Sequence, residues 1–118
     1  MENFRFLNWT IYTEAKNIFG KILIINNKLP NEIKFSLGDQ PIRSSLSVVL
    51  NIAEGSGKNS DRELNRYFNI AIGSLYETLA NLDILKDEKY ISKEQYNSLF
   101  TQIESIIKQL GGFKKLLK

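Results

Sequence analysis

The chain has 118 residues, of which 42% are hydrophobic and 25% charged, so it suits one globular domain over residues 1–118 and not a disordered segment. It contains no histidine and no cysteine, which excludes disulfides, thiolate sites, Ser-His-Asp relays, histidine-bound zinc and Glu-x-x-His di-iron sites. The net charge is +3, but the last 14 residues hold four lysines and no acid, so the remaining 104 residues carry 12 basic and 13 acidic side chains.

Apolar residues recur at spacings of three and four, a pattern that predicts amphipathic helices and an all-α protein. The first helix is predicted over about 9–28 and ends before Pro30, because proline disfavours helical backbone in the residue before it. The second is predicted over about 39–55. Asp39 is its predicted cap, and Pro41 falls in the first turn, where amide protons lack partners.

The third helix is predicted over about 61–87, with Ser60 as its cap and Glu63 completing a capping box. The fourth is predicted over about 92–110 or beyond and is expected to weaken at Gly111-Gly112. Short connections between long helices favour antiparallel neighbours. The sequence therefore predicts an antiparallel up-down-up-down four-helix bundle.

No targeting or membrane-spanning segment is expected. The first nine residues lack a basic segment followed by an apolar one, and the aliphatic run at 22–25 is too short to cross a bilayer. We expect a cytoplasmic protein with no membrane partner.

The second helix has an unusually wide apolar face. At 100° per residue, its polar side chains share an arc of about 100°, and its apolar side chains fill about 200°. A surface helix needs a narrower stripe, so this helix is expected to bury more than one side, either inside the chain or against a second subunit. The apolar residues are Ile42, Leu46, Val48, Val49, Leu50, Ile52 and Ala53.

The third helix carries small residues opposite its core stripe. Gly73 in mid-helix costs about 1 kcal/mol relative to alanine, and a glycine beside Ser74 suits the close approach of another helix. The alternative is an ordinary solvated face formed by Ser74, Glu77 and Asn81.

Glu54 and Glu77 raise the possibility of general acid/base chemistry at a helix junction. The alternative, which we favour, is that both are hydrogen-bonded structural carboxylates, with Glu54 paired to Arg43 or Arg66. The stretch 55–60 does not match a phosphate-binding loop, because it follows a helix and lacks the first glycine. We predict no enzyme activity, catalytic residue, cofactor or metal.

Two strings on the second and third helices resemble a family signature. They are Gln40-x-x-Arg43-x-x-x-Ser47-x-x-x-Asn51-Ile52-Ala53-Glu54-Gly55 and Tyr67-Phe68-x-Ile70-Ala71-x-Gly73-Ser74-Leu75-x-Glu77. The chain resembles the four-helix-bundle proteins related to those encoded in the intervening sequences of bacterial large-subunit (23S) ribosomal RNA genes. One departure is Pro41-Ile42, where a basic residue is often expected, so an RNA contact there is disfavoured.

The resemblance implies a four-helix bundle that assembles as a ring, commonly a homopentamer, without enzyme activity. It also implies kinship with the accessory proteins of diversity-generating retroelements, which bind nucleic acid and a reverse transcriptase. On this resemblance we expect structural or interface roles for the signature residues Gln40, Arg43, Ser47, Asn51, Glu54, Gly55, Gly73, Ser74 and Glu77.

The leading hypothesis is a homo-oligomer that binds RNA or DNA through basic residues. The candidates are Lys58, Arg62, Arg66, Lys108, Lys114, Lys115 and Lys118. No aromatic residues suited to stacking on RNA are evident, so we expect weak sequence selectivity. The alternative is a purely structural assembly factor for a protein partner such as a reverse transcriptase, in which the basic residues only aid solubility.

Overall fold

The computed structural model describes the backbone of residues 2–117 and the side chains of residues 4–117, and this part of the chain is helical without a strand. A 3-10 helix, η1 (Glu2–Asn8), is followed by five α-helices. They are α1 (Thr10–Asn27), α2 (Asn31–Lys34), α3 (Asp39–Ser56), α4 (Asp61–Asp87) and α5 (Lys93–Lys115). The all-α prediction is confirmed.

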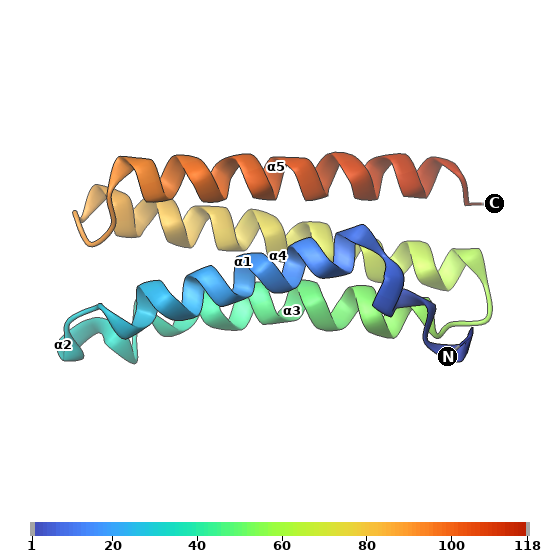
Figure 1. The fold of residues 1–118 in the computed structure, drawn as a ribbon, viewed down its shortest axis with the longest axis horizontal. Helices are drawn as coiled ribbons and strands as arrows, with labels where there is room; N and C mark the ends of the chain where they lie inside the picture. Colours follow the sequence, from blue (N-terminus) through green and yellow to red (C-terminus); the bar gives the residue numbers. More distant parts are fainter. Residues whose placement is uncertain (1, 118) are drawn as a thin grey trace.

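The four long helices lie lengthwise beside one another, and each runs opposite to the long helix before it (Figure 1). Helix α3 contacts both α1 and α4, and α5 contacts α4 and α1. η1, the turn between α3 and α4 and the end of α5 gather at one end, whereas α2 and the turn between α4 and α5 lie at the other (Figure 1). The molecule measures 45 × 23 × 20 Å, so these two ends are well separated.

The observed helices differ from the predicted ones in three places. Helix α5 continues through Gly111-Gly112, where a weakening is predicted, and ends at Lys115, because Phe113 packs edge-on against Trp9 and Phe68 with ring centroids 4.9 Å away from each. Neither η1 nor α2 is among the predicted helices. Asp39 is not a cap, since it lies inside the first turn of α3 and its carboxylate accepts a 2.6 Å hydrogen bond from Arg43 Nε.

Ser60 caps α4 as predicted, because its hydroxyl oxygen accepts a hydrogen bond from the Glu63 amide at 3.2 Å. The predicted capping box is not completed, since the Glu63 carboxylate accepts a hydrogen bond from Arg66 Nε instead. Ser92 and Gln95 form a full capping box at the start of α5. These caps satisfy amide protons that have no partner inside the helix, and they fix where α4 and α5 begin.

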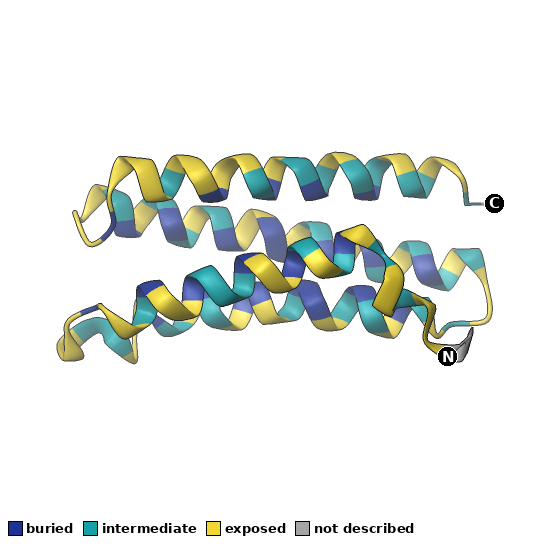
Figure 2. Ribbon diagram, viewed as in Figure 1, coloured by how far each residue is buried: buried dark blue, intermediate teal, exposed yellow. Residues whose placement is uncertain are grey.

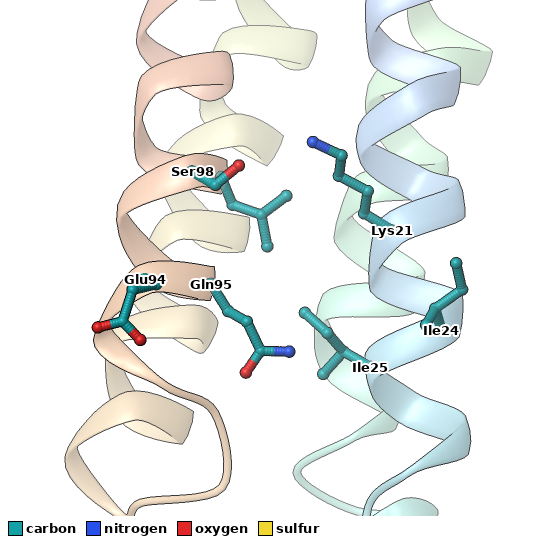
Figure 3. A pocket seen from close by; sticks show the side chains of 7 residues that line it. Lys21, Ile24, Ile25, Glu94, Gln95 and Ser98 are labelled. Carbon is teal, nitrogen blue, oxygen red and sulfur yellow. The ribbon is translucent and has the colours of Figure 1, made fainter.

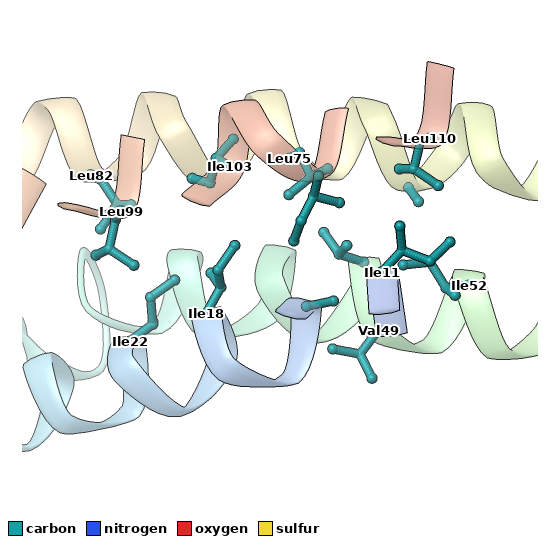
Figure 4. Close-up of a cluster of buried hydrophobic side chains, with 14 of the residues drawn as sticks. Ile11, Ile18, Ile22, Val49, Ile52, Leu75, Leu82, Leu99, Ile103 and Leu110 are labelled. Atoms are coloured by element: carbon teal, nitrogen blue, oxygen red, sulfur yellow. The ribbon is translucent and has the colours of Figure 1, made fainter. Parts of the chain in front are cut away.

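The core lies between the four long helices, each of which turns its buried residues inward (Figure 2). Isoleucine from α1 and α3 meets leucine and isoleucine from α4 and α5 in one continuous cluster (Figure 4). Members that are at most 2% exposed include Ile18, Ile22, Ile52, Leu75, Leu82, Leu99, Ile103 and Leu110.

Helices α3 and α4 approach closely along a seam of small side chains. A Cβ atom built on Gly55 would lie 2.7 Å from Tyr67 Cβ, which is closer than real Cβ atoms come. Farther along the seam, the Ser47 and Ser74 hydroxyl groups lie 2.9 Å apart, and those of Ser44 and Thr78 lie 2.7 Å apart. The wide apolar face of α3 is thus partly buried within the chain, between α1 and α4.

The Gly55→Ala variant is expected to lower the free energy of unfolding by about 1–3 kcal/mol, because the new methyl group forces α3 and α4 apart. Urea unfolding followed by circular dichroism measures this. The matched control is Gly20→Ala in α1, where a Cβ would have no heavy atom within 4 Å. That change should raise the free energy of unfolding by about 0.5–1 kcal/mol. Equal effects at both positions would contradict the close approach.

Candidate nucleic-acid interface

A groove of about 570 Å³ separates the first turns of α4 from the last turns of α5. Two of the predicted phosphate contacts from α5, Lys114 and Lys115, line it together with Arg62 from α4. Because α4 and α5 run in opposite directions, the start of one helix faces the end of the other. We call this site the basic groove; its other lining residues are Asp61, Asn65, Gly111 and Leu117.

The cations of the basic groove remain available for an anion. Within the described residues, neither Arg62 nor Lys115 forms an ion pair, and both are exposed. Lys114 Nζ donates a hydrogen bond to Asn69 Oδ1, an uncharged partner that leaves the ammonium charge uncompensated. The carboxylate of Asp61 also lines the groove and reduces its positive potential.

Lys58 and Arg66 lie at the same end of the molecule but in a different setting. They flank the ring of Tyr67, with Lys58 Nζ 5.2 Å and Arg66 Cζ 4.9 Å from its centroid. Lys58 also approaches Glu54 at 3.9 Å, and Arg66 donates a 3.1 Å hydrogen bond to Glu63. That hydrogen bond raises the pKa of the Arg66 guanidinium above its ordinary value. Both charges are therefore partly neutralised.

Of the remaining two predicted contacts, Lys108 does not line the basic groove. Lys108 precedes Lys115 by seven residues, about 10 Å along the helix. It lines a separate groove of about 310 Å³ between α4 and α5, beside Tyr76, Phe100 and Glu104. Lys118 lies outside the described residues.

Another groove, of about 460 Å³, lies on the other flank of the C-terminal end of α5. Trp9 and Phe113 line it, and the guanidinium of Arg5 lies 5.2 Å from the Trp9 ring centroid. We call it the aromatic groove; its other lining residues are Asn8, Thr10, Ile11, Gln109, Gly112 and Leu116. Sequence reasoning missed this site, although the aromatic-rich opening segment that ends at Trp9 was its signal.

The signature residues divide between the α3–α4 seam and the outer surface. Ser47 bonds Ser74, and Asn51 Nδ2 donates to the Ser47 carbonyl at 2.8 Å, so these residues tie the seam together with Gly55. The other five are exposed in the single chain: Gln40, Arg43, Glu54, Gly73 and Glu77. A Cβ on Gly73 would have no heavy atom within 4 Å, so no helix of the same chain packs against it.

The predicted pairing of Glu54 with Arg43 or Arg66 is wrong. Tyr67 donates a 3.0 Å hydrogen bond to Glu54 through its hydroxyl group, and Arg43 and Arg66 bond acids on their own helices instead. Tyr67 precedes Glu77 by ten residues, about 15 Å along α4. Glu54 and Glu77 therefore do not share one site.

A further opening, of about 370 Å³, lies between α1 and α5 at the opposite half of the molecule. Lys21 reaches from α1 toward α5 across an apolar lining that includes Ile25 (Figure 3). Its ammonium group donates a 2.7 Å hydrogen bond to Gln102. With one basic residue already bonded, this opening suits a phosphate less well than the basic groove does.

Within the described residues, no cluster of acidic side chains could hold a metal ion, and none of the helices combines the length and the hydrophobicity that a membrane span requires.

Comparison with known proteins places the sequence beside one family. Residues 8–112 match the family model described as 23S rRNA-intervening sequence protein. A crystal structure from Bacteroides thetaiotaomicron, described as a protein of unknown function from the S23 ribosomal protein family, is 29% identical in sequence. The match covers 90% of this chain and 99% of that one, with a TM-score of 0.83. No match is found among curated proteins.

Proposed function

Because the chain belongs to the family of 23S rRNA-intervening sequence proteins, we propose that it is a non-enzymatic, homo-oligomeric protein that binds RNA or another nucleic acid in the cytoplasm. The observation that carries this proposal is the meeting of Arg62, Lys114 and Lys115 in one groove, although Arg62 and Lys114 lie far apart in the sequence. Nucleic acid carries closely spaced phosphates, and proteins bind such phosphates through clustered lysine and arginine side chains.

The direct test is binding of a labelled RNA at several salt concentrations. Each phosphate that a cation neutralises releases a counterion, so the logarithm of the binding constant should fall linearly with the logarithm of salt. With three to five contacts to a single strand, the slope should be about −2 to −3.5. A binding constant that stays the same between low and high salt would rule out phosphate recognition.

We also propose that this chain is an antiparallel up-down-up-down four-helix bundle and that five copies of it assemble into a ring. The copies would contact one another through the outer face of α3 and α4. Large apolar side chains remain exposed there in the single chain: Leu50 is 55% and Ile70 41% exposed. Gly73 offers bare backbone on the same side of α4, where a second chain can approach closely. Apolar surface of this kind is stabilised by burial against another chain.

The Gly73→Leu variant is expected to break the oligomer while leaving the helix content intact. A Cβ atom at this position has no heavy atom within 4 Å, so the chain has room for the start of the new side chain, which would occupy the place of the proposed partner. Light scattering after size exclusion should give about 68 kDa for five unmodified chains of 13.6 kDa, and a mass near one chain for the variant. The matched control is Gly20→Leu, another open position in mid-helix. An oligomer that survives Gly73→Leu would place the interface elsewhere.

A second candidate function is a structural assembly factor whose partner is a protein, for example a reverse transcriptase. The groove of about 310 Å³ that Lys108 lines favours this function, because Tyr76, Leu79 and Phe100 give it an apolar lining that suits a protein side chain. Under this function, the chain should bind RNA weakly or not at all at every salt concentration.

A further inference from the structure

The basic groove and the aromatic groove lie on opposite flanks of the same helical turn at the end of α5. Gly111 lines the basic groove, and its neighbour Gly112 lines the aromatic groove. The peptide unit between these two residues is therefore the boundary between a cationic surface and an aromatic one.

This boundary carries no side chain. A Cβ atom on Gly111 or on Gly112 would have no heavy atom of the chain within 4 Å. Packing inside the chain thus does not require glycine here, and two glycines inside a helix weaken it. What the pair does provide is bare backbone, over which an extended ligand can pass from one groove into the other.

The two grooves differ in the chemistry they offer. Arg62, Lys114 and Lys115 attract phosphate groups in the basic groove. Across the boundary, half-buried Trp9 and Phe113 lie beside Leu116, which is 80% exposed. An aromatic and apolar surface next to a cationic one matches a strand whose bases are free to stack, because a duplex hides the faces of its bases.

We propose that the ligand is single-stranded nucleic acid that crosses α5 at Gly111-Gly112, with its phosphates in the basic groove and an unpaired base in the aromatic groove. This inference rests on the proposed function and specifies its ligand class. The guanidinium of Arg5, above the Trp9 ring, adds a cation to the aromatic side.

Trp9 is the one tryptophan of the chain, so its fluorescence reports directly on the aromatic groove. We would titrate the protein with a 12-nucleotide single-stranded RNA and with a 12-base-pair duplex of the same sequence. The single strand should bind at least tenfold more tightly and quench the fluorescence. Inorganic polyphosphate should compete for the basic groove and leave the fluorescence unchanged.

The matching variant is Gly112→Leu, whose side chain would fill the boundary on the aromatic side. It should lower the affinity for the single strand at least tenfold and abolish the quenching, whereas Gly20→Leu should do neither. Gly112→Ala provides a second check. It should raise the unfolding temperature, and the unfolding temperature of Gly112→Leu, measured in the same way, shows whether its loss of binding comes with an intact fold.

The outcomes separate the two proposals. If no nucleic acid binds, the proposed function fails along with this inference. Equal binding of single strand and duplex, with unchanged Trp9 fluorescence and an unaffected Gly112→Leu variant, overturns the inference alone. If poly-glutamate competes as well as unlabelled single-stranded RNA does, the inference is also overturned, because the site would then accept any acidic chain.

Discussion

Replacing Arg62, Lys114 and Lys115 with glutamate should lower the affinity for single-stranded RNA on the order of 100-fold in moderate salt, because three phosphate contacts are lost and three repulsions are added. The salt dependence should change with it. Each lost contact removes about 0.7 from the slope of the logarithm of the binding constant against the logarithm of salt, or about 2 in all. Fluorescence anisotropy of a labelled RNA measures both quantities.

The control moves the same charge change to the other end of the molecule. Lys28, Lys89 and Lys93 are exposed and lie near the end of α1 and around the start of α5, so their replacement by glutamate changes the net charge equally. This control should retain most of the affinity. If it loses as much as the first variant, binding follows total charge and the basic groove has no special role.

The Phe68→Ala variant should lower the free energy of unfolding by about 3–5 kcal/mol. Phe68 is 0% exposed, and its ring packs edge-on against Trp9 at 6.1 Å and Phe113 at 4.9 Å between centroids. Removing it leaves a cavity beside Trp9 and Phe113, which line the aromatic groove, and loosens the end of α5. Urea unfolding at a fixed protein concentration measures the change.

Phe35→Ala is the matched control, because Phe35 is 83% exposed and has little packing to lose. We expect a change within about 0.5 kcal/mol. Similar losses from the two variants would mean that Phe68 is not a central support of the fold.

The extents of the helices could be predicted from the sequence because local rules govern them. The predicted third helix, over 61–87, agrees with α4 since Ser60 caps it and the apolar stripe has the helical period. Local rules failed where contacts distant in sequence decide the outcome. Gly111-Gly112 predicts a weakening of the fourth helix, but Phe113 holds the last turns against Trp9 and Phe68.

The candidate site could be predicted only in part. The types of residue were evident from the cluster of lysines near the C-terminus, but which cations share a groove depends on how far α4 and α5 extend beside each other. That geometry unites Arg62 with Lys114 and leaves Lys108 in another groove. The two signature glycines also look alike in sequence, yet Gly55 faces Tyr67 closely and Gly73 faces open space.

The hydroxyl pairs between α3 and α4 have a consequence for the uniqueness of the fold. Apolar contacts alone tolerate a slide of one helix past another, because one leucine can replace its neighbour at similar cost. Ser44 with Thr78 and Ser47 with Ser74 can form both pairs together in the observed register. A shift by one turn would leave at most one hydroxyl pair across the seam, at a cost of about 0.5–1.5 kcal/mol for each hydrogen bond that is lost. The seam thereby selects one alignment of the helix pair from several that burial alone would allow.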